Sequence, residues 1–254
     1  MRKWEKLEIE LVTKAPFRIG GVKPIPGTTD VDSPVVKLGN KIVVQGTSLK
    51  GALRHELETY LIDNFLDKIT RRWKNPWLKP CIPADERTIS ADERKLLENG
   101  FYKFCCSYPN PNDYICPVCY LLGARGLVGF VNVPFLNMTK GSVEPLQFIR
   151  EDRVIGTSAR GERGAIGKFE AIPEDSVFKG VVTILVEDDI LGWKIGQKRN
   201  LTESQGDKWL DSAEWTKDKV ENDLIKDRLV NIKDLGGYRS KGFGQVDIKI
   251  KPMT

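Results

Sequence analysis

The sequence has one histidine, His55, among 254 residues, which excludes catalytic mechanisms that need two. It contains no apolar run long enough to span a bilayer and no secretory signal pattern. The Walker pattern of nucleotide-binding loops and the dinucleotide-binding fingerprint are also missing. We therefore expect a cytoplasmic protein with no membrane partner and no nucleotide cofactor.

The charge balance is only slightly positive, because 40 Lys and Arg residues stand against 35 Asp and Glu residues and give a net charge of +5. Such a balance permits a nucleic-acid partner without requiring one, since the clustering of charge matters more than its sum. Hydrophobic residues make up 40% of the chain, which is enough to bury the core of one elaborated domain or two small ones.

Five cysteines are an odd number, and two of them form the motif Cys116-Pro-Val-Cys119. In a cytoplasmic protein this spacing indicates a metal knuckle rather than a disulfide framework. The knuckle supplies two thiolates for one tetrahedral zinc, and we expect Cys81 and Cys106 to supply the others, with Cys105 as a substitute. Four thiolates leave no open position, so this zinc is expected to be structural. A pair of buried free thiols is the alternative.

The stretch 45–54 organises the first half of the chain. An apolar strand at 42–44 leads into a Gly-Thr-Ser turn, and leucines four residues apart predict a helix from Ser48 to about Phe65. A helix that begins directly behind a strand presents free N–H groups, which suit a phosphate. The candidate phosphate contacts are Gly46, Thr47, Ser48, Lys50 and Arg54. Alternatively, Ser48 is only a helix cap and the basic residues form a solvated face, as we expect for His55.

A second glycine-rich segment, residues 235–246, lies between an amphipathic helix expected over 218–235 and a final strand. Its glycines would let backbone N–H groups line up on an anion. The candidate contacts here are Gly237, Arg239, Ser240 and Lys241. Two such turns indicate one polyphosphate surface more strongly than either turn alone.

The remaining segments predict further elements. Residues 6–13 and 177–186 are expected strands, 67–114 is an insertion, 150–168 is a protruding arm, and 193–215 is a surface excursion. The long loop 15–37 carries Asp30 and Asp32. Loop carboxylates usually form turns, but a carboxylate beside a phosphate site also suits a metal ion. Arg125, between glycines, either touches phosphate or is simply exposed.

Four collinear blocks of this sequence resemble the RAMP superfamily, specifically the repeating backbone subunit of type III (Csm/Cmr-type) CRISPR RNA-guided complexes. The blocks are Ile19-Gly20-Gly21 followed by Asp32-Ser33-Pro34-Val35, the stretch Gln45 to Arg54, Cys116-Pro-Val-Cys-Tyr-Leu-Leu-Gly123, and Gly236-Gly-Tyr-Arg-Ser-Lys-Gly-Phe-Gly244. Asp152-Arg153-Val-Ile-Gly156 is similar to the family's thumb region. The chain departs from the family at Gln45-Gly-Thr-Ser, often Pro-Gly-Ser-Ser, and at Leu121-Leu-Gly, often Leu-Phe-Gly.

The resemblance implies one α+β domain with a ferredoxin-like, RRM-related βαββαβ core, formed by 1–66 and 121–254. It also implies a zinc-bearing lid at 67–120 and a thumb hairpin at about 145–172. Copies of the chain would stack along a guide (CRISPR) RNA with other subunits of a type III effector complex. Arg125 and Arg153 would add RNA contacts.

In active members of the family an acidic residue of the long loop cuts complementary target RNA. By its position before Ser-Pro-Val that residue is Asp32, with Asp30 in reserve. Asp32 would bind Mg²⁺ or another divalent cation or help to deprotonate the 2′-hydroxyl of the RNA, and we favour the metal. The alternatives are a non-catalytic RNA-binding scaffold, a metal-independent endoribonuclease that processes the guide precursor, and a zinc-stabilised adaptor that binds no RNA.

Overall fold

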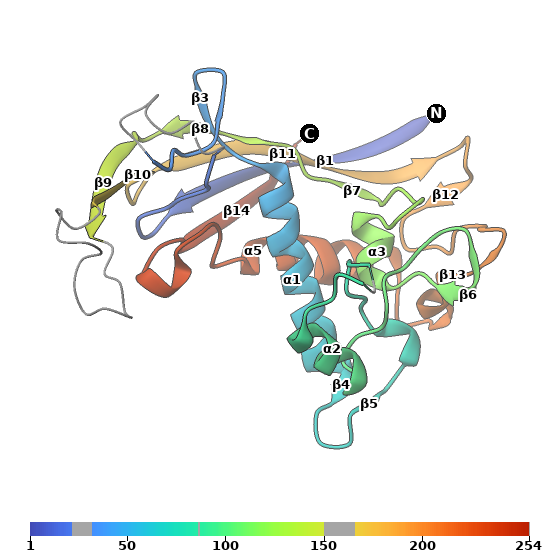
Figure 1. Ribbon diagram of the computed structural model, residues 1–254. Helices are drawn as coiled ribbons and strands as arrows, with labels where there is room; N and C mark the ends of the chain where they lie inside the picture. Colours follow the sequence, from blue (N-terminus) through green and yellow to red (C-terminus); the bar gives the residue numbers. More distant parts are fainter. Residues whose placement is uncertain (22–31, 86, 150–165, 254) are drawn as a thin grey trace.

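A broad antiparallel sheet forms one layer of the molecule, and the longer helices lie against one of its faces (Figure 1). The computed structural model describes residues 1–21, 32–85, 87–149 and 166–253. The main path of the sheet has the order β14-β1-β11-β8-β3-β2, and β7 and β12 pair with β11. These strands are β1 (Arg2–Thr13), β2 (Lys37–Leu38), β3 (Lys41–Val44), β7 (Val131–Asn132), β8 (Leu136–Lys140), β11 (Val177–Asp188), β12 (Trp193–Lys194) and β14 (Val246–Pro252).

The central strand β1 shows why the sheet has a buried and an open face. Leu7, Ile9 and Leu11 are at most 1% exposed, whereas Glu10 faces outward and pairs with Lys179 of β11 at 2.9 Å. Side chains alternate between the two faces of a strand, so the apolar set points to the helices. The predicted strands over 6–13 and 177–186 are confirmed, and both are longer than expected.

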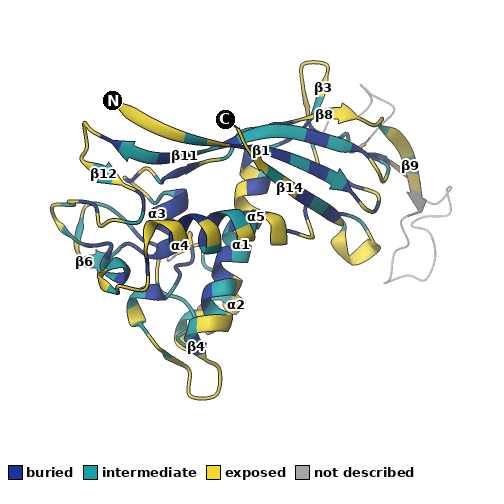
Figure 2. Cartoon of the chain, turned by 180° about the vertical axis from the view of Figure 1, so that it is seen from behind, coloured by how far each residue is buried: buried dark blue, intermediate teal, exposed yellow. Residues whose placement is uncertain are grey.

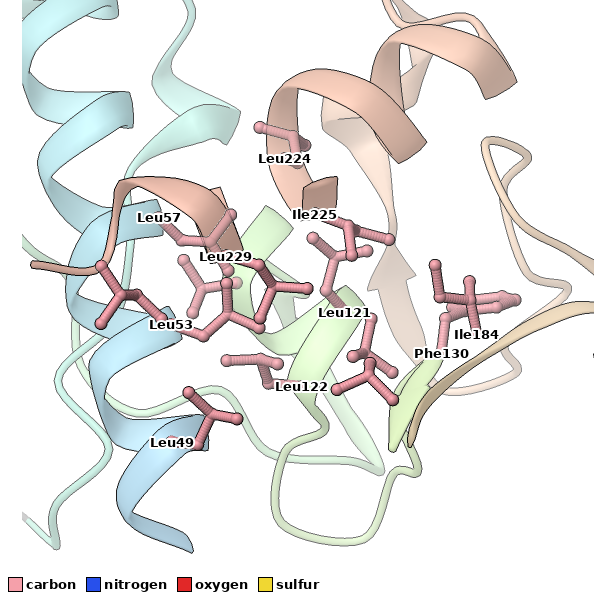
Figure 3. Close-up of a cluster of buried hydrophobic side chains, with 14 of the residues drawn as sticks. Leu49, Leu53, Leu57, Leu121, Leu122, Phe130, Ile184, Leu224, Ile225 and Leu229 are labelled. Carbon is pink, nitrogen blue, oxygen red and sulfur yellow. The ribbon is translucent and has the colours of Figure 1, made fainter. Parts of the chain in front are cut away.

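Helix α1 (Gly46–Phe65) follows β3 directly and supplies much of the core. Its leucines at 49, 53, 57 and 61 are all fully buried. Figure 3 shows three of them facing Leu121 and Leu122 of α3 (Pro117–Leu122) and apolar side chains of the C-terminal helix. The helix begins two residues earlier than predicted. Thr47 and Ser48 therefore lie inside its first turn, and Gln45, the residue at the cap position, makes no side-chain cap hydrogen bond.

The C-terminal helix is shorter than the predicted 218–235. It consists of α4 (Lys217–Glu221), a π-helical turn (Asn222–Lys226) and α5 (Asp227–Asn231). The residues after it leave the helix because the Leu235 N–H donates to the Gly244 carbonyl at 2.8 Å and Asp234 pairs with Gln245. Ile232 and Leu235 are buried although they lie beyond the end of α5. Their spacing therefore shows that they belong to the core and does not show that they are helical.

Residues 67–120 form a body below the sheet, which we call the lid. It contains α2 (Ala91–Glu98), which has no buried residue (Figure 2). Its strands are β4 (Leu66–Asp67), β5 (Arg72–Trp73) and β6 (Asn110–Tyr114). β6 pairs in parallel with β13 (Ser204–Gly206), which belongs to the excursion 193–215.

The excursion 193–215 lies at the surface in part, but several of its residues are anchored in the core, which the sequence did not predict. Trp209 and Trp215 are 0% and 3% exposed. Arg199 and Asp207 form a fully buried ion pair at 2.7 Å, and the Arg199 guanidinium lies 4.7 Å from the ring centre of Tyr120 in α3. Arg199 and Asp207 give the segment a polar sequence, yet both are buried because they neutralise each other inside the fold.

A hairpin of β9 (Glu144–Ile149) and β10 (Ile166–Ala171) curls away from one end of the sheet (Figure 1). Its strands lie within the thumb hairpin predicted at about 145–172, whereas most of the predicted arm at 150–168 lies outside the described residues. Residues 150–165, and Arg153 with them, lie outside the described part of the chain, as does Asp30. Within the described residues, no helix combines the length and the apolar character needed to cross a membrane.

Candidate functional site

Four cysteine sulfurs meet between α1, α3 and the lid. The Sγ atoms of Cys81, Cys106, Cys116 and Cys119 all lie within 4.8 Å of one another, and each residue is at most 1% exposed. These are the four residues that the sequence selected. Zinc bound tetrahedrally at about 2.3 Å would hold its sulfurs about 3.8 Å apart, so this cluster fits such an ion. Cys105 is partly exposed, and its sulfur donates instead to the Cys106 carbonyl at 3.4 Å.

Arg54 belongs to this cysteine cluster and not to a phosphate surface. Its guanidinium donates to the Cys119 sulfur at 3.5 Å, to the Cys81 carbonyl at 3.3 Å and to Glu58 at 3.1 Å. Burial raises the pKa of Glu58 to about 7, although Arg54 opposes that shift. Because a tetrathiolate carries excess negative charge when it binds Zn²⁺, a buried cation beside it is electrostatically favourable. Our assignment of Arg54 to RNA is therefore not supported by its contacts.

Gly46 also serves the fold. A Cβ at this position would lie 2.2 Å from the Val133 carbonyl oxygen. Only glycine lets the start of α1 approach the segment 133–134 this closely. The residue is buried, so its own surface is closed to phosphate.

The two glycine turns do come together. Ser48, Gly51 and His55 of α1 and Gly236 and Arg239 of the C-terminal loop line one cavity of about 690 Å³, which we call the glycine groove. His55 is exposed, as predicted. The groove brings the first turns of a long helix and Arg239 from the other end of the chain to one surface, which suits a phosphate-bearing ligand. Glu56 and Asp234 also line it and offset part of its positive charge.

The loop beside this groove is shaped by two glycines with positive φ. Gly236 and Gly244 both have φ of 90°, and a Cβ at either would meet a backbone carbonyl oxygen at 2.4 or 2.5 Å. Arg239, Ser240 and Lys241 form a single exposed 3-10 turn between them. The cationic side chains therefore project from a rigid and closely packed loop.

Asp32 is held against strand β10 of the β9-β10 hairpin. Its backbone N–H donates to the Lys168 carbonyl at 3.0 Å, and its Oδ2 accepts from the Lys168 N–H at 2.9 Å. The next residue, Ser33, bridges to Phe169. The Phe169 ring packs against Tyr238 of the glycine loop, with centroids 5.5 Å apart. Asp32 is exposed. It directly precedes Ser33, which bridges to Phe169, and Phe169 in turn supports the glycine loop through Tyr238.

Arg18 contacts both the segment that follows Asp32 and the glycine loop. It was not among the site residues predicted from the sequence. It is 9% exposed, donates to the Ser33 carbonyl at 3.1 Å, and lies over the rings of Phe169 and Tyr238 at 5.9 and 5.2 Å. Its own carbonyl accepts from Gly237 at 2.9 Å. The sequence signal that could have identified Arg18 is its position in an apolar run just before two glycines.

Replacing Arg18 with leucine is expected to loosen this junction. Hydrogen bonds from a charged donor contribute roughly 1.5–3 kcal/mol, so amide exchange in residues 32–36 and 237–243 should accelerate while that of β14 stays unchanged. Hydrogen exchange read by mass spectrometry measures this. Arg228→Leu is the control, because Arg228 also lies over a tyrosine ring, Tyr60, at 4.4 Å. Equal protection in wild type and Arg18→Leu would contradict the role.

Lys50 and Arg125 lie away from the glycine groove. Both line a second cavity, between α1 and the lid. Thr47 is exposed at the start of α1. The predicted contacts are therefore divided between two surfaces on different faces of one helix.

Comparison with known proteins gives the same fold. A chain in a structure described as "Cryo-EM structure of the Type III-B Cmr-beta bound to cognate target RNA" superposes with a TM-score of 0.53 at 12% identity. The match covers 99% of this chain and 61% of that one, so this chain spans less than two thirds of its neighbour. Among curated proteins, none matches. A family model for the RAMP superfamily matches residues 10–247, nearly the whole sequence, and the chain therefore belongs to the RAMP superfamily.

Proposed function

We propose that this protein is an RNA-binding backbone subunit of a type III CRISPR effector complex that holds the guide RNA and cuts complementary target RNA. Family membership and the fold shared with a chain of a target-bound type III-B assembly support the complex. The observation that carries the proposal is the glycine groove, where the start of α1 meets Arg239. Other copies of the chain and further subunits would continue the groove along the RNA.

The topology supports a ferredoxin-like core. Counting β1, β8, β11 and β14 as the four strands, their order in the sheet is fourth, first, third, second, and each neighbouring pair is antiparallel. α1 lies between the first and second of these strands, and the C-terminal helix lies between the third and fourth. The lid and the β9-β10 hairpin are insertions into this βαββαβ pattern, as a zinc-bearing lid and a thumb would be.

Cleavage is assigned to Asp32. RNA carries its own nucleophile in the neighbouring 2′-hydroxyl, so the protein needs to align the attacking and leaving groups and balance charge. Among the described residues the Asp32 carboxylate has one hydrogen-bond partner, at Oδ2, which leaves Oδ1 for an incoming group. One exposed carboxylate together with RNA phosphates fits Mg²⁺, which keeps several waters. The ion would neutralise phosphate charge.

Lys50→Ala is expected to weaken binding of single-stranded RNA and to make it less sensitive to salt. Each phosphate neutralised adds about 0.7 to the slope of log affinity against log salt for single strands, so the slope should fall by about that amount. Fluorescence anisotropy at several salt concentrations measures it. Lys95→Ala removes an equal charge from α2 in the lid and should leave the slope unchanged. A wild type that binds no RNA at low salt would refute the RNA-binding function.

The processing endoribonuclease is the second candidate, because His55 lines the same groove as Ser48 and Arg239. The two functions differ in their need for metal. Incubation of precursor RNA with the isolated protein in EDTA separates them, since our proposal expects no cutting there, whereas the alternative expects cleavage that His55→Ala removes.

A further inference from the structure

A second cavity is lined by residues other than those of the glycine groove. It has a volume of about 1050 Å³ and lies between α1, the lid and the segment 122–132. We call it the lid groove. Lys50 and Arg54 reach it from α1, Phe104 and Cys105 from the lid, and Arg125 from the segment 122–132. Nothing in the proposed cleavage step uses it.

Large apolar side chains are exposed in the lid groove. Trp4 is 45% exposed, Phe104 is 52% exposed and Val128 is 75% exposed, and all three line the groove. Burying such side chains is favourable, so exposed aromatic rings gathered at one concave surface mark a binding site. Half-exposed aromatic rings offer a surface on which planar ligands can stack.

The charged residues of the lid groove favour an anion. Lys50 and Arg125 are exposed, and neither forms an ion pair with any residue that the structure describes. Arg54 also lines the groove, but its guanidinium is held by the Cys119 sulfur and Glu58 and is not counted as an anion contact. The carboxylate lining the groove is that of Asp85, which accepts from the Arg87 N–H at 3.0 Å. Cations interleaved with aromatic rings are the chemistry by which proteins bind single-stranded nucleic acids.

The lid groove and the glycine groove lie on opposite sides of α1. At about 100° per residue, Lys50 lies roughly 200° around the helix from Ser48, and both residues belong to its first turns. The lid groove is therefore a surface separate from the glycine groove, and no residue lines both.

We propose that the lid groove binds unpaired nucleotides of single-stranded RNA, with bases stacked on Phe104 and Trp4 and phosphates held by Lys50 and Arg125. This rests on the proposed RNA-binding function and adds a base-stacking surface to it. Stacking tolerates any base, so the groove contributes affinity without sequence preference.

Phe104→Ala and Trp4→Ala test the proposal. The full-length protein is titrated against a labelled single-stranded RNA of mixed sequence. Loss of one stacked base weakens binding by about five- to a hundredfold, with the salt slope unchanged because no charge is removed. Phe135→Ala is the matched control, since Phe135 is also 45% exposed but does not line the groove. Unchanged metal content and melting temperature verify that each variant folds.

A second measurement locates the RNA directly. RNA carrying photoreactive 4-thiouridine should cross-link to peptides containing Phe104 or residues 123–129. Wild-type affinity in both aromatic variants, alongside weaker binding by Lys50→Ala, would overturn the stacking site while leaving the RNA-binding function intact. Lost self-association of those variants without loss of RNA affinity would assign the groove to a second copy of the chain and would also overturn the proposal. A wild type without any RNA affinity would instead refute the underlying function.

Discussion

Asp32→Asn is expected to reduce guided cleavage of target RNA by about a hundredfold or more, the lower range of what positioned acid–base or metal-binding groups contribute. The change removes one charge and little else. The asparagine carbonyl oxygen still accepts from the Lys168 N–H, which lies 2.9 Å from Asp32 Oδ2. The loop should therefore keep its place against β10, and binding of guide and target should be unaffected.

The measurement is single-turnover cleavage by the reconstituted complex with saturating target. Glu170→Gln is the matched control. Glu170 lies two residues along β10 from Lys168, accepts from the Val35 N–H at 2.9 Å and pairs with Lys37 at 3.0 Å. It sits in the same neighbourhood and carries the same charge, so its variant should cut at the wild-type rate. Undiminished cutting by Asp32→Asn would leave this protein an RNA-binding scaffold.

Local patterns predicted the elements that depend on neighbouring residues. The alternation in β1 and the leucine stripe of α1 each follow from the burial of one face, which is a property of the element itself. The two cysteines of the CxxC motif, Cys116 and Cys119, could also be predicted as metal ligands, because their spacing is a local feature of the sequence. Adjacent cysteines rarely bind the same ion, which limited Cys105 and Cys106 to one ligand between them. The position of Cys106 in the buried sulfur cluster favours Cys106.

What the sequence could not show were contacts made across the fold. Arg54 looked like a phosphate ligand beside Lys50, because nothing local reveals that the lid folds back and places Cys119 3.5 Å from its guanidinium. Arg199 looked like solvated surface for the same reason, although Asp207 neutralises it in the interior. A buried charge and an exposed charge have the same sequence signature until the partner is known.

The predicted end of the C-terminal helix, at residue 235, was wrong for a different reason. Ile232 and Leu235 keep the helical spacing of buried residues, yet the chain has already turned to pair with the strand region at 244–245. Periodicity detects which side chains are buried, and an extended segment that crosses the core can satisfy it by coincidence.

Cys116→Ser is expected to release the metal and destabilise the lid. Cys116 is fully buried, and its sulfur accepts from the Cys119 N–H at 3.5 Å. Structural zinc sites contribute about 10–16 kcal/mol of apparent binding free energy in small domains. The longest helix of the lid, α2, buries no residue, so the cysteine cluster and buried apolar residues such as Leu78 and Ile115 hold the lid to the core. Elemental analysis should find about one zinc per wild-type chain and almost none in the variant.

Cys105→Ser makes this prediction specific, because the control changes the residue next to a proposed ligand. Cys105 is partly exposed and outside the sulfur cluster, so its variant should retain both the metal and the wild-type melting temperature. Loss of metal from Cys105→Ser with retention in Cys106→Ser would exchange the two assignments.

The metal site is also expected to affect RNA binding, because Arg54 lies beside it. Arg54 and Cys119 both line the lid groove. Loss of the metal should therefore change the shape of this groove, and RNA binding should weaken along with metal binding. A wild type that contains no zinc and is equally stable in a strong chelator would refute the metal centre and with it this coupling.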